Sequence, residues 1–459
     1  MNAHYARHIV HSSKIGFTCR MTNFLPPEFD QRRLLHDEVH ARPVGQAPHP
    51  VVVFCLAVVN RDVTRDQELE HLGKLNSGAD IEQIAGNFAR MRLANGEIKW
   101  ERHTEFTRYT IVLPMGSDQT PSVSSPVVWL AQVRESQTPF APWLAGVPGQ
   151  TLAAVEVTVL VTVDDVLEQG LSFGRDWFGE PTLLTSRLGT QGHSLVLTDF
   201  QVQADGVERM LVLTPAHTSP ARVGRTAHRL IEMEIYRLMA LQGLPVAKAL
   251  GAQLSAAENA LAAIAREVES GTSQDHEMLH DLASLAATIE RANADHNYRF
   301  SATAAYHDIV LQRIKELRET PVSGIQTVGE FIERRLGPAM ATVDATAKRL
   351  ESLSERVSRV SDLLRTRVNI MTEQQNQQLL EKLTRGQALQ LKLQQTVEGL
   401  SIAAISYYVV SLVYYLAKAG KSAGVLSVSP EIVAGVAIAP TVIGVWQVVR
   451  RIHRAIAKD

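Results

Sequence analysis

The chain of 459 residues lacks the cysteine content of a disulfide-stabilised protein. It has two cysteines, Cys19 and Cys55, which excludes a disulfide framework and fits a reducing compartment. Cys55 lies in the apolar run VVVFCLAVV, where a thiol usually packs as a small hydrophobic side chain. The first residues also lack the uninterrupted apolar stretch of a secretory signal. We therefore expect the N-terminal part to stay in the cytoplasm.

A surplus of positive charge is missing as well. Lys and Arg number 46 against 48 Asp and Glu, for a formal net charge of -2. Nucleic-acid-binding domains usually carry a basic excess, so we expect no polynucleotide partner. The length exceeds what one hydrophobic core usually serves, which predicts two or three units.

Motifs of common enzymes are missing too. The sequence has no phosphate-binding loop followed by lysine and a hydroxyl residue, and no G-x-S-x-G elbow. In LLHDEVHARP, His36 and His40 stand four residues apart, a spacing that could place both imidazoles on one helix face for a metal. Zinc-protease helices have Glu after the first His, however, where this chain has Asp37, and no third ligand can be assigned. We favour a coincidental spacing and expect no cofactor, no metal and no enzymatic activity.

A second polar motif is WERHTEF, from Trp100 to Phe106. On a strand, Arg102 would point away from His103 and Glu105, so these three need not form one site. We interpret them as structural pairs. Further along, Arg229, Glu232, Glu234 and Arg237 are spaced for ion pairs on one helix, either solvated or between helices.

Two long apolar segments near the C-terminus are the clearest positive feature. Leu400 to Ala417 and Ile432 to Val449 are each eighteen residues without a charged side chain, about 27 Å of helix. We favour membrane spans over a pair of buried core helices. The tail RRIHRAIAKD is basic, whereas the connector carries only Lys418 and Lys421, so both termini are expected in the cytoplasm.

The first span carries a polar stripe. Its residues recur at steps of four, three and four: Tyr407, Ser411, Tyr414 and Lys418. Hydroxyl groups at membrane depth need hydrogen-bond partners, so the stripe should face another helix or a water-filled space. A packed helix interface is favoured over a pore lining, and the absence of Asp and Glu from both spans weakens any cation-site hypothesis.

A long helix is predicted between residues 337 and 398. Gly337-Pro338 breaks the chain, and from Ala339 to Glu398 there is no further proline, which gives about 90 Å of helix. Apolar residues follow steps of three and four: Leu350, Leu353, Val357, Val360, Leu364, Val368 and Met371. This seam predicts a partner helix. Residues 224–318 contain further helical patterns, so an intramolecular bundle and a homo-oligomeric stalk both remain open.

The predicted fold class is α+β, because β-rich segments separated by Gly, Pro and Ser clusters fill residues 49–222. The six strand candidates are HPVVVFCLAVV, GEIKWERHT, FTRYTIVLP, LAAVEVTVLVTV, GHSLVLTDFQV and VERMLVLTP, and residues 66–91 between the first two are expected as a helix. A strand, helix, strand, strand order occurs twice there, which suggests an internal duplication in pattern. We predict four parts: a cytoplasmic mixed domain 1–222, a helical domain 223–336, a stalk helix 337–398 and a transmembrane hairpin with its tail 399–459.

Several segments together resemble a known bacterial family. They are LLHDEVHARP, WERHTEFTRYT, RLIEMEIYRLMALQGLP, the run from YRFSATAAYHDIVLQRI to FIERRLGPAM, and TVEGLSIAAISYYVVSLVYYLAK. The family is an uncharacterised domain of unknown function described as membrane-anchored, so the resemblance implies the bacterial inner membrane and no reaction. Its motif residues here, of unknown role, are His36, Glu38, His40, Arg42, Trp100, Arg102, His103 and Glu105.

A looser likeness is architectural. A mixed domain, a long helix running into the first of two terminal spans and a basic tail resemble the CorA-type magnesium channels. Those channels carry a Gly-Met-Asn signature at the outer end of the first span, where this chain reads AKAGKSAGV. Lys418 and Lys421 would repel divalent cations there.

Three functions are weighed from the sequence. The leading hypothesis is a non-enzymatic, membrane-anchored protein that binds, senses or scaffolds, in contact with the lipid bilayer and assembled as a homo-oligomer through its stalk and spans. The second is a CorA-like oligomeric channel or transporter without the Gly-Met-Asn filter. The third, and least supported, is a hydrolytic enzyme that uses His36 and His40.

Overall fold

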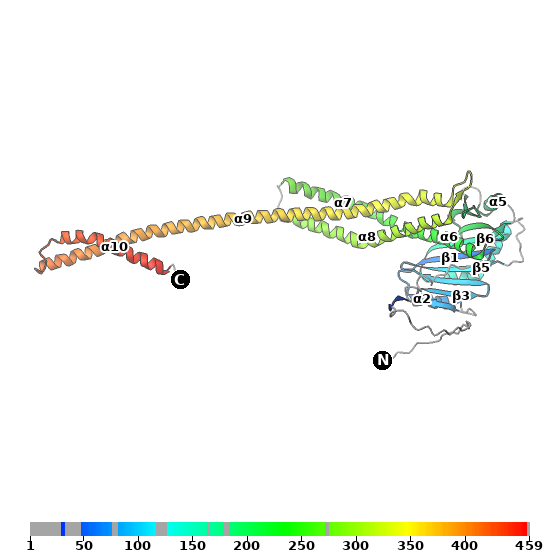
Figure 1. The fold of residues 1–459 in the computed structure, drawn as a ribbon, viewed down its shortest axis with the longest axis horizontal. Coiled ribbons are helices and arrows are strands. Elements are labelled where there is room, and N and C mark those ends of the chain that lie inside the picture. The colour runs from blue at the N-terminus through cyan, green and yellow to red at the C-terminus, as the bar shows by residue number, and fades with distance from the viewer. Residues whose placement is uncertain are drawn as a thin grey trace, which may run out of the picture. The chain divides into compact units, whose positions relative to one another are not determined.

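The computed structural model describes residues 29–32, 47–75, 81–115, 126–162, 166–178, 183–270 and 275–456. It confirms the α+β class, with one mixed sheet formed mainly by the N-terminal half and long helices after it (Figure 1). By its internal contacts the chain divides into two compact units, Met1–Ala260 with Ala287–Ser354, and Leu261–Ala286 with Glu355–Asp459.

The first unit is built on a ten-stranded sheet in the order β10-β7-β8-β9-β6-β1-β5-β4-β3-β2. The strands are β1 (Val51–Val59), β2 (Ile81–Ala85), β3 (Phe88–Leu93), β4 (Gly96–Arg102), β5 (Phe106–Pro114), β6 (Gln150–Thr162), β7 (Leu184–Leu188), β8 (Ser194–Val202), β9 (Glu208–Pro215) and β10 (Thr320–Pro321). Neighbours are antiparallel except β6 and β9, which are parallel. β1 and β6 lie side by side at the centre of the sheet. Each is followed by a helix and then by a meander of strands, with four strands in the first meander and three in the second.

Six segments expected as strands are confirmed as β1, β4, β5, β6, β8 and β9. The expected helix over 66–91 is wrong beyond Gly73, because β2 and β3 occupy its second half. The reason is local: Gly86 has φ +57° and, with Asn87, makes a tight turn between the two strands. A Gly-Asn pair of this kind favours a hairpin over a continuing helix.

One face of the sheet packs an apolar core against four helices. They are α2 (Arg65–Gly73), α3 (Pro126–Gln137), α4 (Ala141–Ala145) and α5 (Val166–Phe178), and a 3-10 turn, Thr138–Phe140, joins α3 to α4. Trp100, Tyr109, Trp143 and Trp177 belong to this core. Because side chains alternate along a strand, Cys55 and Arg108 lie on the opposite face, which α6 (Pro220–Leu241) covers.

The remaining helices of the chain are long. They are α7 (Gly243–Ser270), α8 (Asp275–Leu317), α9 (Val328–Ser422) and α10 (Pro430–Ile456). The break expected at Gly337-Pro338 is wrong, since α9 begins at Val328 and contains Pro338. A residue before proline normally avoids the α conformation because its Cβ clashes with the proline ring, and Gly337 has no Cβ.

The first turn of α9 is fixed by side chains from its surroundings. The backbone N–H of Val328 donates to Ser186 Oγ of β7 at 2.9 Å, and that of Gly329 donates to Glu319 Oε2 at 3.0 Å. Glu330 N–H donates to Thr327 Oγ1 at 3.1 Å. Three N–H groups that an isolated helix would leave without partners are thus satisfied.

The apolar seam expected on α9 is used in two ways. Leu350 and Leu353 are buried in the first unit, and Val357 and Leu364 are buried in the second. In the second unit α7 and α8 supply buried partners, and Arg367 of α9 donates to the carbonyl of Val268. The intramolecular bundle therefore accounts for the seam up to Leu364.

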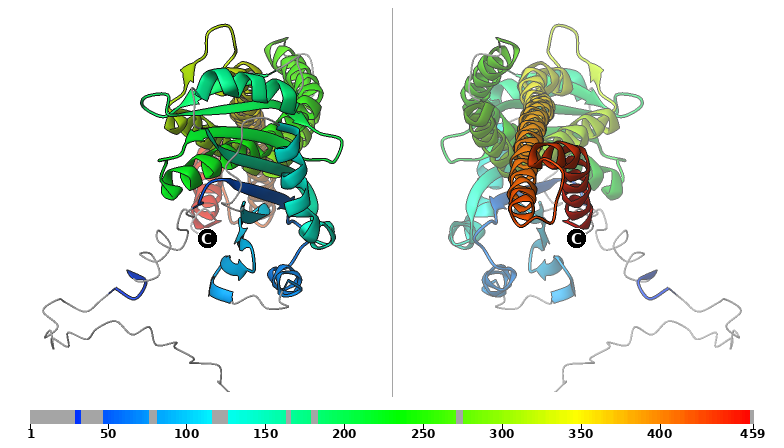
Figure 2. Two further views of the ribbon diagram at one scale, coloured as in Figure 1. Left: turned by 90° about the vertical axis from the view of Figure 1, so that its right-hand side faces the viewer. Right: turned by 90° about the vertical axis from the view of Figure 1, so that its left-hand side faces the viewer.

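Val368 is half-buried, and beyond it a row of large apolar side chains of α9 is exposed. They are Ile370, Met371, Leu379, Leu380, Leu383, Leu389, Leu391, Leu393 and Val397. Further along, the end of α9 lies beside α10 (Figures 1 and 2). Both helices contain a stretch long and apolar enough to span a membrane.

Candidate functional site

The motif from Trp100 to Phe106 divides between two places, because β4 ends at Arg102 and residues 103–105 form the turn to β5 instead of a continuing strand. Arg102 Nη1 lies 2.5 Å from Glu68 Oε1 of α2, and Trp100 Nε1 donates to Glu68 Oε2 at 3.1 Å. Thr107 Oγ1 donates to the same carboxylate at 2.7 Å. Glu68 is fully buried, so this cluster ties α2 to the sheet.

Glu105 serves a different contact. It forms a buried ion pair with Arg299 of α8, and Tyr306 Oη donates to its Oε2 at 2.9 Å. His103 stacks on Phe106 instead, with ring centroids 4.4 Å apart. Two segments that share the family resemblance, the β4–β5 turn and the first unit's part of α8, therefore meet at Glu105.

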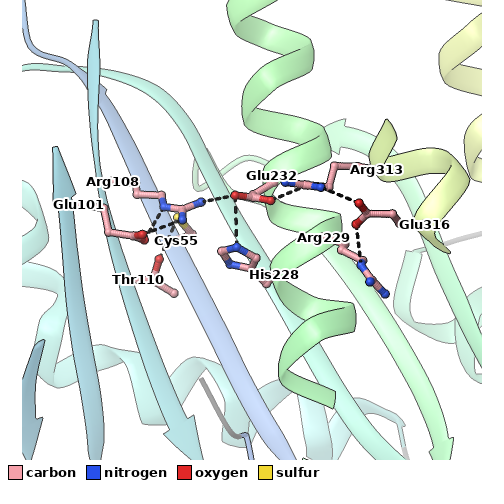
Figure 3. A network of polar contacts seen from close by, with 9 residues as sticks. All are labelled: Cys55, Glu101, Arg108, Thr110, His228, Arg229, Glu232, Arg313 and Glu316. Atoms are coloured by element: carbon pink, nitrogen blue, oxygen red, sulfur yellow. Dashed lines mark hydrogen bonds and ion pairs between the residues drawn. The ribbon is translucent and has the colours of Figure 1, made fainter. Parts of the chain in front are cut away.

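The main polar site of the described residues lies between the sheet and α6 (Figure 3). At its centre Arg108 of β5 donates to both oxygens of Glu101, Nε to Oε2 at 2.5 Å and Nη2 to Oε1 at 2.9 Å. Its third nitrogen, Nη1, donates to Glu232 Oε1 of α6 at 3.2 Å. This planar, bidentate geometry is the arrangement for which arginine suits a buried carboxylate.

The network continues from Glu232 to α8. Arg313 Nε donates to Glu232 Oε2 at 2.6 Å, and His228 Nε2 lies 3.2 Å from Oε1. Arg313 Nη1 donates to Glu316 Oε1 at 3.0 Å, and Arg229 Nε donates to Glu316 Oε2 at 3.0 Å. Figure 3 shows one chain of contacts from Glu101 to Arg229 that joins β4, β5, α6 and α8. We call it the charge network.

Neighbouring arginines keep two carboxylates of the charge network, Glu101 and Glu232, ionised in spite of burial. Burial alone would raise the pKa of Glu101, but the charge of Arg108 and the hydrogen bonds from it hold that pKa below its ordinary value. The pKa of Glu232 is also lowered, because the hydrogen bond and charge of His228, with Arg108 and Arg313, outweigh its burial. Three arginines face three carboxylates along the chain of contacts, so its fixed charge is balanced.

Cys55 packs beside this network as the sequence predicted. It is fully buried, and Thr110 Oγ1 donates to its Sγ at 3.5 Å. Burial raises the pKa of the thiol to about 11. A protonated, buried thiol is a poor nucleophile.

A second buried acid group lies further along α6. Arg237 donates through Nε to Glu234 Oε2 at 2.7 Å, and its Nη2 lies 3.9 Å from Glu208 Oε2 of β9. Two carboxylates thus share one guanidinium. Burial first, then the neighbouring charge and hydrogen bond of Glu234, raises the pKa of Glu208 to about 9. Glu208 is therefore protonated at neutral pH.

Comparison with known families gives a match over most of the chain. A family model described as "protein of unknown function (DUF3422)" matches residues 27–456. The chain belongs to this family. Searches of curated proteins and of solved structures each found no match. The family membership confirms the resemblance to an uncharacterised domain of unknown function, while the likeness to the CorA-type channels stays a prediction from architecture.

For this member of the family, the remaining residues singled out from the sequence are the N-terminal histidine motif and the polar stripe of the first apolar segment. His36, Glu38, His40 and Arg42 lie outside the described residues. Within the described ranges, no group of three or more His, Cys, Asp or Glu side chains could hold a metal ion.

The stripe of the first span lies along a groove between α9 and α10. The groove has a volume of about 560 Å³, and Tyr407, Ser411 and Tyr414 are among its lining residues, with Ala434 and Ile438 of α10. Lys418 is exposed and lies outside it. Ser406, one residue before the stripe, is the polar side chain buried against α10. Sequence reasoning therefore found the polar side of the helix but missed its most buried member.

Proposed function

We propose that this protein is a non-enzymatic, membrane-anchored binding protein of the bacterial inner membrane, assembled as a homo-oligomer through α9. Its two apolar helices would form a two-pass anchor in the lipid bilayer, with both termini in the cytoplasm. The balanced charge of the chain argues against a nucleic-acid partner. The charge network supports a binding role over catalysis, because each of its carboxylates is held by arginine.

The observation that carries this proposal is the row of exposed apolar residues on α9. Seven positions follow spacings of four, three, four, three, four and three: Leu379, Leu383, Gly386, Gln390, Leu393, Val397 and Leu400. The spacing is that of a coiled-coil heptad, and five of the seven residues are apolar, with Gly386 and Gln390 between them. Leu379 and Leu383 are 57% and 64% exposed in the single chain, and burying the exposed part of each is worth about 1–2 kcal/mol. A second copy of α9 would supply the missing surface.

The test is the mass of the full chain in detergent, measured during dilution. We expect a dimer or larger particle, and we expect Leu379→Gln with Leu383→Gln to raise its dissociation constant at least tenfold. The matched control, Glu381→Gln with Lys382→Gln, changes polar neighbours on the same helical turns and should leave the mass unchanged. A monomeric wild-type particle would contradict the proposed assembly.

A second candidate, a CorA-like channel or transporter, is favoured by one observation, the side chains of Tyr407, Ser411 and Tyr414 in the lining of the groove between α9 and α10. One hairpin cannot enclose a pore, so this function also needs an oligomer. The test is cation flux into liposomes that contain the purified chain. Flux that falls with Tyr407→Phe and Ser411→Ala would support a channel, and liposomes no leakier than protein-free ones would exclude it.

A further inference from the structure

A small cavity in the first unit gathers positive side chains at the end of the charge network. It has a volume of about 280 Å³ and lies where the start of α6, the β7–β8 turn and the end of α8 meet. Its charged lining residues are Arg222, Arg225, Arg229, Arg318 and Glu316. Four guanidinium groups against one carboxylate leave three positive charges in excess.

The single carboxylate is already used by the charge network. Glu316 accepts hydrogen bonds from Arg229 and from Arg313, so little of its charge is left for the cavity. No carboxylate among the described residues forms an ion pair with Arg222 or Arg225. These two arginines stand three residues apart on α6, and Arg229 follows four residues later, so all three lie on one helix face.

The other walls of the cavity are polar. Arg318 donates from Nη1 to Thr190 Oγ1 at 2.9 Å, which holds the end of α8 against the β7–β8 turn. His193 completes the wall, and burial, followed by the charges of Arg222 and His217, lowers its pKa. Because that lowered pKa keeps His193 neutral near pH 7, it can take part in hydrogen bonds as donor or acceptor.

We propose that this cavity binds the phosphoryl group of a small soluble phosphate or phosphate ester. Arginine is the residue that best matches the oxygens of phosphate, through two parallel N–H donors. A doubly charged anion would offset most of the excess of three positive charges. The volume lies just below the usual range of drug-sized sites, about 300–1,000 Å³, so it suits the phosphoryl group itself better than a whole nucleotide.

Binding there would reach the sheet through the charge network. Arg229 lines the cavity and also holds Glu316, which shares Arg313 with Glu232 and so connects to Arg108 (Figure 3). This inference names a ligand for the proposed binding role and rests on that role, but it does not depend on oligomer assembly.

The test is calorimetric titration of the full chain, in nanodiscs of zwitterionic lipid, with inorganic phosphate at constant ionic strength set by chloride. We expect one saturable site per chain. Arg222→Gln with Arg225→Gln should weaken binding at least tenfold, and Arg222→Lys, which keeps the charge but loses the fork of donors, should weaken it less. Both arginines are exposed, so the variants should keep the wild-type melting temperature in chloride.

The matched control is Arg334→Gln with Arg359→Gln, two exposed arginines on α9 that pair with glutamates four residues earlier. It should bind phosphate as the wild type does. No saturable binding by the wild type, or equal affinity of the double cavity variant, would overturn the proposal.

Titration of the chain in zwitterionic nanodiscs with dispersed short-chain phosphatidylglycerol provides the second arm. Binding of that lipid that is lost with Arg222→Gln and Arg225→Gln, with no binding of free phosphate, would overturn the assignment to a soluble ligand. Loss of phosphate binding in an intact oligomer would count against this site alone, whereas a monomer that binds phosphate would count against the proposed assembly alone.

Discussion

Tyr306 of α8 donates a hydrogen bond to the carboxylate of Glu105 at 2.9 Å, joining a helix to a turn that lies 201 residues earlier in the chain. Arg299 pairs with the same carboxylate, and the side chains of Arg299 and Glu105 are only 9% and 7% exposed. The motif WERHTEF therefore anchors α8 to the sheet.

Removal of this carboxylate should be costly. Glu105→Ala leaves the Arg299 charge buried without a partner, and we expect a loss of about 3–5 kcal/mol in the free energy of unfolding. Denaturant unfolding of the detergent-solubilised chain measures it. The exposed pair of Glu330 and Arg334 provides the control, because Glu330→Ala should cost no more than about 1 kcal/mol. Equal losses in both variants would refute a structural role for Glu105.

The buried acid pair of Glu208 on β9 and Glu234 on α6 predicts a particular pH dependence. The pKa of Glu208 is raised to about 9 from an ordinary value of 4.5, so the folded chain holds a proton that the unfolded chain releases. This stabilisation is complete below about pH 4.5 and is lost as the pH rises toward 9, by at most about 1.4 kcal/mol per pH unit. Thermal unfolding from pH 5 to 9 tests it: Glu208→Gln should flatten the curve, whereas the exposed Glu330→Gln should not.

Two glycines of α9 should respond differently to alanine. Gly386 lies inside the helix with open space around it in the single chain, so Gly386→Ala should stabilise the helix by about 1 kcal/mol when it is made in the Leu379→Gln, Leu383→Gln background, in which the seam has no second copy against it. Gly337 also has open space, but it precedes Pro338, and the new Cβ would clash with the proline ring. Gly337→Ala should therefore give no gain in helix content or melting temperature. A gain equal to that of Gly386→Ala would contradict this explanation.

The thiol of Cys55 should be unreactive in the folded chain. With a pKa near 11, only about one thiol in a thousand is ionised at pH 8. In a Cys19→Ser background, we expect labelling by a thiol reagent to need denaturant or a pH close to 11. Rapid labelling of the native chain at pH 8 would show that the site opens.

The sequence predicted the strands well because each carries its signal locally. Alternating or continuous apolar residues between turn residues mark β1 and β5 without reference to the rest of the chain. The same reasoning failed at β2 and β3, where the Gly86-Asn87 turn interrupts a stretch that resembles a helix. The duplicated order in the N-terminal domain and the domain boundaries stay predictions.

The charge network was not predictable in the same way. Glu232 meets Arg108 across 124 residues and Arg313 across 81 residues, and no local pattern encodes such contacts. The sequence contained a weaker signal that α6 has polar contacts on more than one side. Glu232 and Glu234 are two residues apart, so their side chains point to nearly opposite sides of the helix. Both are buried, one in the charge network and the other beside Glu208. The expected pairing is confirmed within α6 for Glu234 with Arg237, and between helices for Arg229 and Glu232, which pair with Glu316 and Arg313 of α8.

The start of α9 carries a consequence for the order of folding. Forming the first turn is the slow and unfavourable step of any helix, and here Ser186, Glu319 and Thr327 supply the acceptors for that turn. Two of these groups reach their places only when β7 has joined the sheet and α8 has ended beside it. We therefore expect amide protons of the first turn to become protected after those of β7 and β8 in pulse-labelled hydrogen exchange during refolding. The sheet would thus act as the template from which a 95-residue helix grows.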